Sequence, residues 1–210
     1  PAGRTLSGTD PVSAIVTLQA LGADAVGCNC STGPEGMIPL IRAMAPYAKV
    51  PLAAKPNAGL PVLREGKTFF PMSAEEFAGF AKEFASAGVK FLGGCCGTTP
   101  EHIRMLHARA QGLKPGEIRD RVPAALSSSR RSVCLDRQGP LLVIGERINP
   151  TGKKDLQEEL LSGRMALVKK FAQEQVKKGA ALLDVNVGMP GIDEALTLKD
   201  VVKTLSVSTD

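Results

Sequence analysis

The chain has 210 residues, and its composition of 43% hydrophobic and 22% charged residues is that of a globular protein rather than a disordered one. The net charge of +5 is mild, and one Tyr with no Trp offers little for base stacking, so we predict no nucleic-acid partner. We also predict no membrane-spanning helix, because no run of about 18 apolar residues occurs. No secretory signal is visible in this sequence, because no charged-then-apolar stretch follows Pro1.

Apolar strands and amphipathic helices alternate over the first half of the chain. Buried apolar runs predict strands over residues 23–30, 50–54 and 89–92. Helices are predicted behind Asp10-Pro11, over the stripe from Met37 to Met44, behind the Ser73/Glu76 capping box and behind Thr99-Pro100. Strands that alternate with helices indicate a parallel sheet joined by right-handed crossovers.

The stretch from 111 to 139 breaks this alternation. It combines Lys114-Pro115-Gly116 with a Ser-Ser-Ser-Arg-Arg run at 127–131, and it shows no apolar period. Such a composition predicts an interdomain linker with solvated basic residues. Cys134 lies inside this linker, and we assign it no role.

The second half opens another β/α pattern. Strands are predicted over 141–144 and 181–187, with helical sequence over 155–178, where Gly163 could interrupt it, and again from Asp193. A β/α barrel needs roughly 250 residues, so neither half can close one. We therefore predict an α/β fold made of parts of two consecutive (β/α)8 TIM barrels, both incomplete: residues 1–110 end the first, 111–139 form a linker, and 140–210 begin the second.

The positions of the cysteines in the sequence indicate a metal-binding site. Five is an odd number and two are adjacent, so we expect reduced thiols and a cytoplasmic location rather than a disulfide framework. Cys30 and the Cys95-Cys96 pair follow predicted strands, and the glycines around the pair allow adjacent side chains to converge. Three thiolates suit zinc and leave its fourth position for a substrate.

Other interpretations of these cysteines remain open. Each could be a small buried hydrophobe, or two of them could form a redox pair. A closed structural zinc site would need a fourth ligand from Cys28, His102 or His107. Cys28 lies two residues before Cys30, so in a regular strand both side chains would point the same way.

Two motifs carry a family resemblance in the first half. GCNCSTGP at 27–34 and GGCCGTTPEHI at 93–103 resemble the zinc-binding part of homocysteine methyltransferase barrels, and the Lys55-to-Gly59 segment resembles the strand end between them. The resemblance implies that Cys30, Cys95 and Cys96 are the zinc ligands and catalytic residues. Cys28 stands outside the pattern, whereas Asn29 matches it.

Two further motifs, GERINPTG at 145–152 and LDVNVG at 183–188, resemble a pterin-binding methyltransferase domain. The resemblance implies that Glu146, Asn149, Asp184 and Asn186 bind the pterin, whose amide and amino edge can pair with carboxylates and carboxamides. The alternatives are a surface ion pair between Glu146 and Arg147, and a turn or cap at Asp184-x-Asn186. No glycine-rich phosphate-binding pattern occurs.

The two domains in this order resemble the cobalamin-dependent methionine synthases. That family transfers a methyl group from methyltetrahydrofolate via cobalamin to zinc-bound homocysteine thiolate, giving methionine and tetrahydrofolate. Neither His102 nor His107 lies in an Asp-x-His-x-x-Gly pattern, so we expect cobalamin to come from another domain or chain. The alternatives are a betaine-type zinc-dependent homocysteine methyltransferase and a non-catalytic zinc- or folate-binding fragment.

Overall fold

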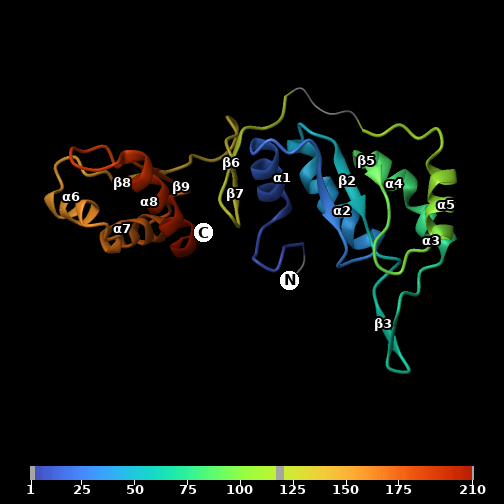
Figure 1. Cartoon of the computed structure of the whole chain (residues 1–210). Coiled ribbons are helices and arrows are strands. Elements are labelled where there is room, and N and C mark those ends of the chain that lie inside the picture. Colours follow the sequence, from blue (N-terminus) through green and yellow to red (C-terminus); the bar gives the residue numbers. More distant parts are fainter. Residues whose placement is uncertain (1–2, 117–120, 210) are drawn as a thin grey trace. The chain divides into compact units, whose positions relative to one another are not determined.

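The computed structural model describes residues 3–116 and 121–209 (Figure 1). The chain divides into two compact units, Pro1–Ser127 and Ser128–Asp210. The division lies inside the predicted linker, which carries the short strands β6 (Ala125–Ser127) in the first unit and β7 (Ser132–Cys134) in the second. No helix in the described ranges combines the length and the apolar character needed to cross a bilayer. The assignment of the two units to two barrels stays a prediction.

The first unit is built on a three-stranded parallel sheet, as predicted. Its strands have the spatial order β1 (Val26–Asn29), β2 (Leu52–Lys55) and β5 (Val89–Leu92). The described residues of this unit form the α-helices α1 (Pro11–Ala20), α2 (Pro34–Met44), α3 (Ala74–Gly79), α4 (Ala81–Ser86) and α5 (Pro100–Ala110). A 3-10 turn, η1 (Ala45–Tyr47), follows α2. Because all three strands are parallel, the segments that follow them emerge at one edge of the sheet.

One face of this sheet packs against helices. Leu52 and Ala54 alternate with more exposed residues along β2 and are buried with Ile41, Met44 and Phe84. The N-terminal caps were correctly predicted: Asp10 Oδ1 accepts a hydrogen bond from the Ser13 N–H at 2.7 Å, and Ser73 and Glu76 form the capping box. These local contacts begin the helices that bury the sheet.

The helix predicted behind Ser73 is divided in two. A 3-10 hydrogen bond from the Phe80 N–H to the Phe77 carbonyl, at 3.3 Å, separates α3 from α4. Gly79, which has low helix propensity, lies at this point. Apolar periodicity continues across the interruption because Phe77, Ala81 and Phe84 are all buried.

A hairpin follows β2 that the sequence analysis did not predict. Strands β3 (Val62–Arg64) and β4 (Lys67–Phe69) are antiparallel and project from the first unit (Figure 1). The connecting residues Glu65 and Gly66 have φ values of +51° and +74°, as a two-residue hairpin turn requires. All six strand residues are exposed, so no buried apolar run marked them as strands.

The second unit contains a pair of parallel strands, β8 (Ile144–Ile148) and β9 (Leu182–Val185). Over its described part, up to residue 209, this unit also contains the helices α6 (Lys154–Leu161), α7 (Ala166–Lys177) and α8 (Glu194–Ser208). The strand predicted over 141–144 is wrong in its bounds, because pairing with β9 begins only at Ile144, opposite Leu182. Gly163, at φ +68°, does interrupt the predicted helical stretch between α6 and α7.

Candidate functional site

Cys30 lies immediately beyond the carboxyl end of β1. Its backbone N–H donates to the Lys55 carbonyl at 3.0 Å, so it continues the pairing with β2 by one step. Cys30 and Ser31 then adopt φ values of +63° and +64°, which L-residues rarely occupy. This left-handed turn ends the strand's alternation, so the direction of the Cys30 side chain no longer follows that of the strand residues.

Cys95 and Cys96 lie in the tight loop that follows β5. The Thr98 N–H and hydroxyl both donate to the Cys95 carbonyl, at 3.1 and 2.7 Å, and close the loop. Gly97 has φ +78°, and a Cβ atom added there would lie 2.2 Å from Phe70 Cβ. Only glycine fits this position, which explains how adjacent cysteines can turn toward one point, as the sequence predicted.

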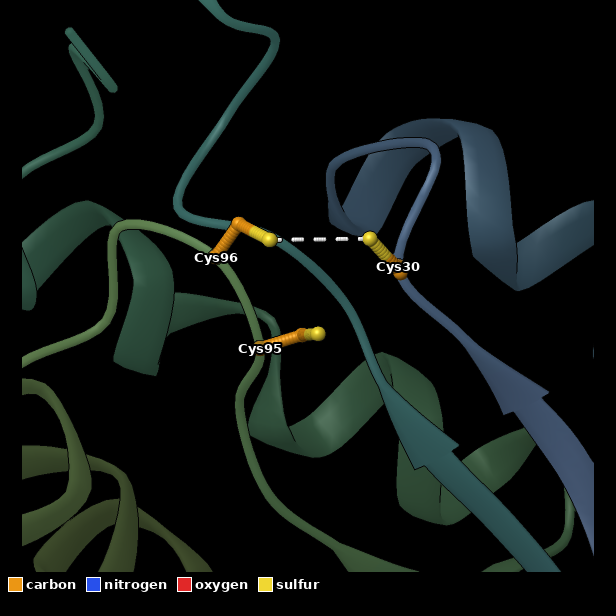
Figure 2. A group of neighbouring side chains, drawn as sticks. All are labelled: Cys30, Cys95 and Cys96. Atoms are coloured by element: carbon orange, nitrogen blue, oxygen red, sulfur yellow. Dashed lines mark hydrogen bonds between the residues drawn. The ribbon is translucent and has the colours of Figure 1, made fainter. Parts of the chain in front are cut away.

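The three predicted cysteines come together in the structure. Their Sγ atoms all lie within 4.8 Å of one another, and the Sγ atoms of Cys30 and Cys96 are 3.6 Å apart (Figure 2). Tetrahedral zinc with Zn–S bonds of about 2.3 Å would place its sulfur ligands roughly 3.8 Å apart. The donor set and its spacing therefore fit a zinc ion with three protein thiolates.

Hydrogen bonds within the cluster shift the pKa values of Cys30 and Cys96 in opposite directions. The Ser31 backbone, followed by the Cys96 and Cys95 thiols, lowers the pKa of Cys30 below its usual value. Hydrogen bonding with Cys30 and Cys95 raises the pKa of Cys96 to about 11. These hydrogen bonds therefore favour the thiolate form of Cys30 over that of Cys96.

Cys28 lies outside this cluster, as the family resemblance implied, and the alternative in which it points the same way as Cys30 and serves as a fourth ligand is not what forms. Its Sγ lies 3.7 Å from the Met44 Sδ, and it packs against the apolar core of the first unit. Burial raises the pKa of its thiol. The regular alternation assumed in that alternative fails because β1 ends at Asn29 and Cys30 is left-handed.

The two histidines offered as fourth ligands also have other partners. His102 is 8% exposed; its Nδ1 accepts from the Thr99 N–H at 3.3 Å, so its Nε2 is left to donate to the Met72 carbonyl at 3.1 Å. His107 Nε2 contacts the Gln111 side chain at 2.8 Å on the exposed face of α5. His102 therefore stabilises the start of α5, and neither histidine joins the cysteine cluster.

Sequence reasoning missed the role of the segment after β2. Because β2 is the central strand, this segment lies between the two loops that carry the cysteines. Asn57 is 3% exposed there, and its Oδ1 accepts from the Cys96 N–H at 3.2 Å. An asparagine after a strand is a common turn residue. The family resemblance marked the Lys55-to-Gly59 segment that contains Asn57 without assigning this residue a role, and the strand order supplies what that match did not.

Of the polar residues expected to bind a pterin, Asn149 and Asn186 directly follow the carboxyl ends of β8 and β9, whereas Glu146 and Asp184 lie within those strands. Asn149 Nδ2 donates to Glu146 Oε1 at 2.8 Å, so the structure brings these two side chains together. Asn186 is placed beside β8 by a hydrogen bond from its N–H to the Ile148 carbonyl, at 2.9 Å. Its own Oδ1 accepts from the Gly188 N–H at 2.7 Å, as expected for a turn, and Asp184 is exposed.

A bulge in β8 lies at Glu146 and Arg147, whose side chains contact different partners. Gly145 pairs with Leu183 and Ile148 with Val185, so two residues of β8 oppose the single residue Asp184. The Arg147 guanidinium lies over the Phe171 ring at 4.7 Å and contacts Glu174 at 2.8 Å, both on α7. Arg147 therefore pairs with the helix rather than with Glu146, and the alternative of a Glu146–Arg147 surface ion pair is not what forms.

Comparison with known proteins places these sites in context. The family model described as homocysteine S-methyltransferase matches residues 1–110. Methionine synthase from Mycobacterium tuberculosis is 35% identical over 211 residues, covering 99% of this chain and 17% of that protein. Methionine synthase from Mycobacterium leprae is 34% identical over 216 residues, covering 97% of this chain and 18% of that protein. The chain thus spans less than a fifth of these curated relatives.

Among solved structures, the homocysteine methyltransferase MmuM from Escherichia coli is similar in two forms. The metallated form has 26% identity and a TM-score of 0.36, covering 45% of this chain and 27% of that one. The apo form has 25% identity and a TM-score of 0.41, covering 51% of this chain and 36% of that one.

Proposed function

Because the chain belongs to the homocysteine S-methyltransferase family, we propose that its first unit holds zinc through Cys30, Cys95 and Cys96 and binds the sulfur of homocysteine there. The observation that carries this proposal is the convergence of three Sγ atoms within 4.8 Å, delivered by two loops at one edge of the sheet. Three protein ligands leave the fourth position of a tetrahedral metal for the substrate.

The chemistry of this site follows from the thiol group. A free thiol has a pKa of about 8.5, and coordination to zinc deprotonates it, so the sulfur nucleophile is available at neutral pH. The homocysteine sulfur supplies the electron pair of the new S–CH3 bond while the bond between the methyl group and its donor breaks. A zinc ion held by Cys30, Cys95 and Cys96 would bind the neutral thioether of the product more weakly than the anionic thiolate of homocysteine, and this would favour release of methionine.

For the second unit, we propose that Glu146, Asn149, Asp184 and Asn186 bind methyltetrahydrofolate, and that cobalamin comes from another domain or chain. The match to methionine synthases covers nearly all of this chain, so it extends through the second unit. A betaine-type enzyme would need no pterin site. The complete protein would then convert homocysteine and methyltetrahydrofolate to methionine and tetrahydrofolate, with cobalamin between the two sites.

Metal analysis of the complete protein tests the proposal. We expect one zinc per chain, with most of it lost when Cys30, Cys95 or Cys96 is replaced by Ser. Cys28→Ser is the matched control and should keep its zinc, because this thiol packs in the core. X-ray absorption should show three sulfur ligands, rising to four at about 2.3 Å when homocysteine is added. A count of four without homocysteine, or full zinc in all three variants, would refute the assignment.

A further inference from the structure

Gly145 and Ile148 of β8 both face the helices of the second unit, although they are three residues apart. A Cβ atom added at Gly145 would lie 2.7 Å from Gln175 Oε1 on α7, and Ile148 is 1% exposed in the apolar cluster to which α7 contributes. Side chains alternate along a regular strand, so residues three apart would point to opposite faces. The bulge at Glu146 and Arg147 removes this conflict, because it adds one residue between them.

The same bulge brings together Glu146 and Asn149, two of the residues proposed to bind the pterin. They are also three apart, and Asn149 directly follows the strand. In a regular strand their side chains would diverge, whereas here Asn149 Nδ2 donates to Glu146 Oε1 at 2.8 Å. A change of register by one residue turns every following side chain to the other face. The contact between these two side chains therefore depends on the bulge.

The side chain of Gln175 holds the bulge in place. A bulged residue lacks its partner on the neighbouring strand, and the Arg147 N–H donates instead to Gln175 Oε1 at 2.8 Å. The Nε2 atom of the same carboxamide donates to the Phe171 carbonyl at 3.1 Å, which fixes the orientation of the amide. Gln175 is 6% exposed, so water competes little for these hydrogen bonds.

The backbone of Gln175 connects the same point to β9. Its carbonyl accepts from the Ala180 N–H at 3.0 Å, in the turn that leads into β9, and the Ala181 N–H donates to the Val143 carbonyl at 2.8 Å. Gln175 therefore contacts β8 through its side chain and the turn before β9 through its carbonyl. Both contacts act on the register between the two strands, and the bulge depends on that register.

We infer that Gln175 is a positioning residue for the proposed pterin site: by accepting from the Arg147 N–H it keeps the bulge that brings Glu146 and Asn149 together. This inference rests on the proposed function of the second unit, and it adds a residue on α7, behind the strand that carries the site. It also explains Gly145, because a residue without a Cβ atom lets the carboxamide approach the strand.

The test compares Gln175→Leu and Gln175→Glu with wild type in the complete protein, using equilibrium titration with methyltetrahydrofolate and crystal structures of the variants. Gln175→Leu keeps a side chain of comparable size without the acceptor. It should weaken folate binding about 10-fold and lose the hydrogen bond between Glu146 and Asn149. Gln175→Glu keeps an acceptor oxygen for the Arg147 N–H and should restore most of the affinity. A role in packing alone predicts the reverse order, because Leu is buried more readily than Glu.

Two further variants check the same contact. In Gly145→Ala the added Cβ, 2.7 Å from Oε1, should displace the Gln175 carboxamide and weaken folate binding to a similar extent. Gln173→Leu is the matched control, since Gln173 is an exposed residue of the same helix, and it should bind folate as wild type does. Zinc content should be unchanged in all four variants.

The outcomes separate this inference from the proposed function. If Glu146→Gln and Asn149→Ala both bind folate as wild type does, the proposed pterin site is wrong, and the crystal structures then decide the positioning role by themselves. A Gln175→Leu structure that keeps the bulge and the contact between Glu146 and Asn149 overturns the inference, and so does wild-type folate affinity in this variant. If Gln175→Leu does not fold, wild-type affinity in Gly145→Ala overturns it.

Discussion

Cys30 Sγ lies 3.6 Å from Cys96 Sγ, although the two residues are 66 positions apart in the chain. Their strands, β1 and β5, are not neighbours, since β2 lies between them in the sheet. The short distance therefore depends on the loops after β1 and β5, which both bend toward the carboxyl end of β2. The left-handed backbone at Cys30 and the glycine-containing turn at Gly97 provide those two bends.

Replacing Gly97 should damage both stability and metal binding. In Gly97→Ala the new Cβ would meet Phe70 at 2.2 Å in a left-handed backbone, so the loop must move and the Cys95-Cys96 pair with it. Gly66→Ala is a matched control, because Gly66 has φ +74° but nothing within 4 Å of an added Cβ. We expect Gly66→Ala to cost about 1–2 kcal/mol in denaturant unfolding and to keep its zinc. Equal zinc content in both variants would contradict this account.

His102 should matter for stability and not for metal binding. His102→Ala removes the partners of the Thr99 N–H and the Met72 carbonyl in a site that is 8% exposed. The cost should be about 1–3 kcal/mol of the free energy of unfolding, as expected for unsatisfied buried groups. The exposed His107→Ala is the control and should leave stability nearly unchanged. Loss of zinc from folded His102→Ala would show that this histidine is a metal ligand after all.

The pterin residues can be tested by direct binding of methyltetrahydrofolate to the complete protein. Glu146→Gln and Asn149→Ala should each weaken binding by about 1–3 kcal/mol, because each removes a hydrogen bond to a buried polar ligand. Zinc content should not change in either variant. Glu174→Gln is a suitable control, since this carboxylate lies on α7 and contacts Arg147 rather than Glu146 or Asn149. Unaltered folate affinity in both variants would remove these residues from the proposed site.

The capping box of α3 should make stability depend on pH in the acidic range. Hydrogen bonds from the Ser73 side chain and backbone lower the pKa of Glu76 from its usual value of 4.5. Because the pKa is lower in the folded state, the ionised carboxylate contributes stability above pH 4.5, and this contribution is lost as pH falls through the folded-state pKa.

Urea unfolding as a function of pH can check this contribution. Wild type should lose stability more steeply than Glu76→Gln below pH 4.5, while Ser73→Ala should cost about 1 kcal/mol near neutral pH through loss of the N-cap. Parallel pH profiles for wild type and Glu76→Gln would show that the carboxylate contributes nothing.

Features that depend on neighbouring residues could be predicted from the sequence. The Asp10 cap, the Ser73/Glu76 box and the interruption at Gly163 depend on contacts within one or two turns, and all three are present. The buried apolar runs correctly identified the three strands of the parallel sheet in the first unit, β1, β2 and β5. The cysteines could be chosen from their positions after those strands and their glycine neighbours, which is a statement about the chain's local geometry.

The tertiary structure decided which of these residues meet. The order β1-β2-β5 places Asn57 between the cysteine loops, and no local pattern states which strand is central. The register between β8 and β9 creates the bulge that separates Glu146 from Arg147. Likewise, Cys28 and Cys30 face different surroundings because a hydrogen bond to Lys55 and a left-handed turn end the regular strand. Strand order and register depend on hydrogen bonds between segments far apart in the chain, and short-range sequence patterns do not encode these pairings.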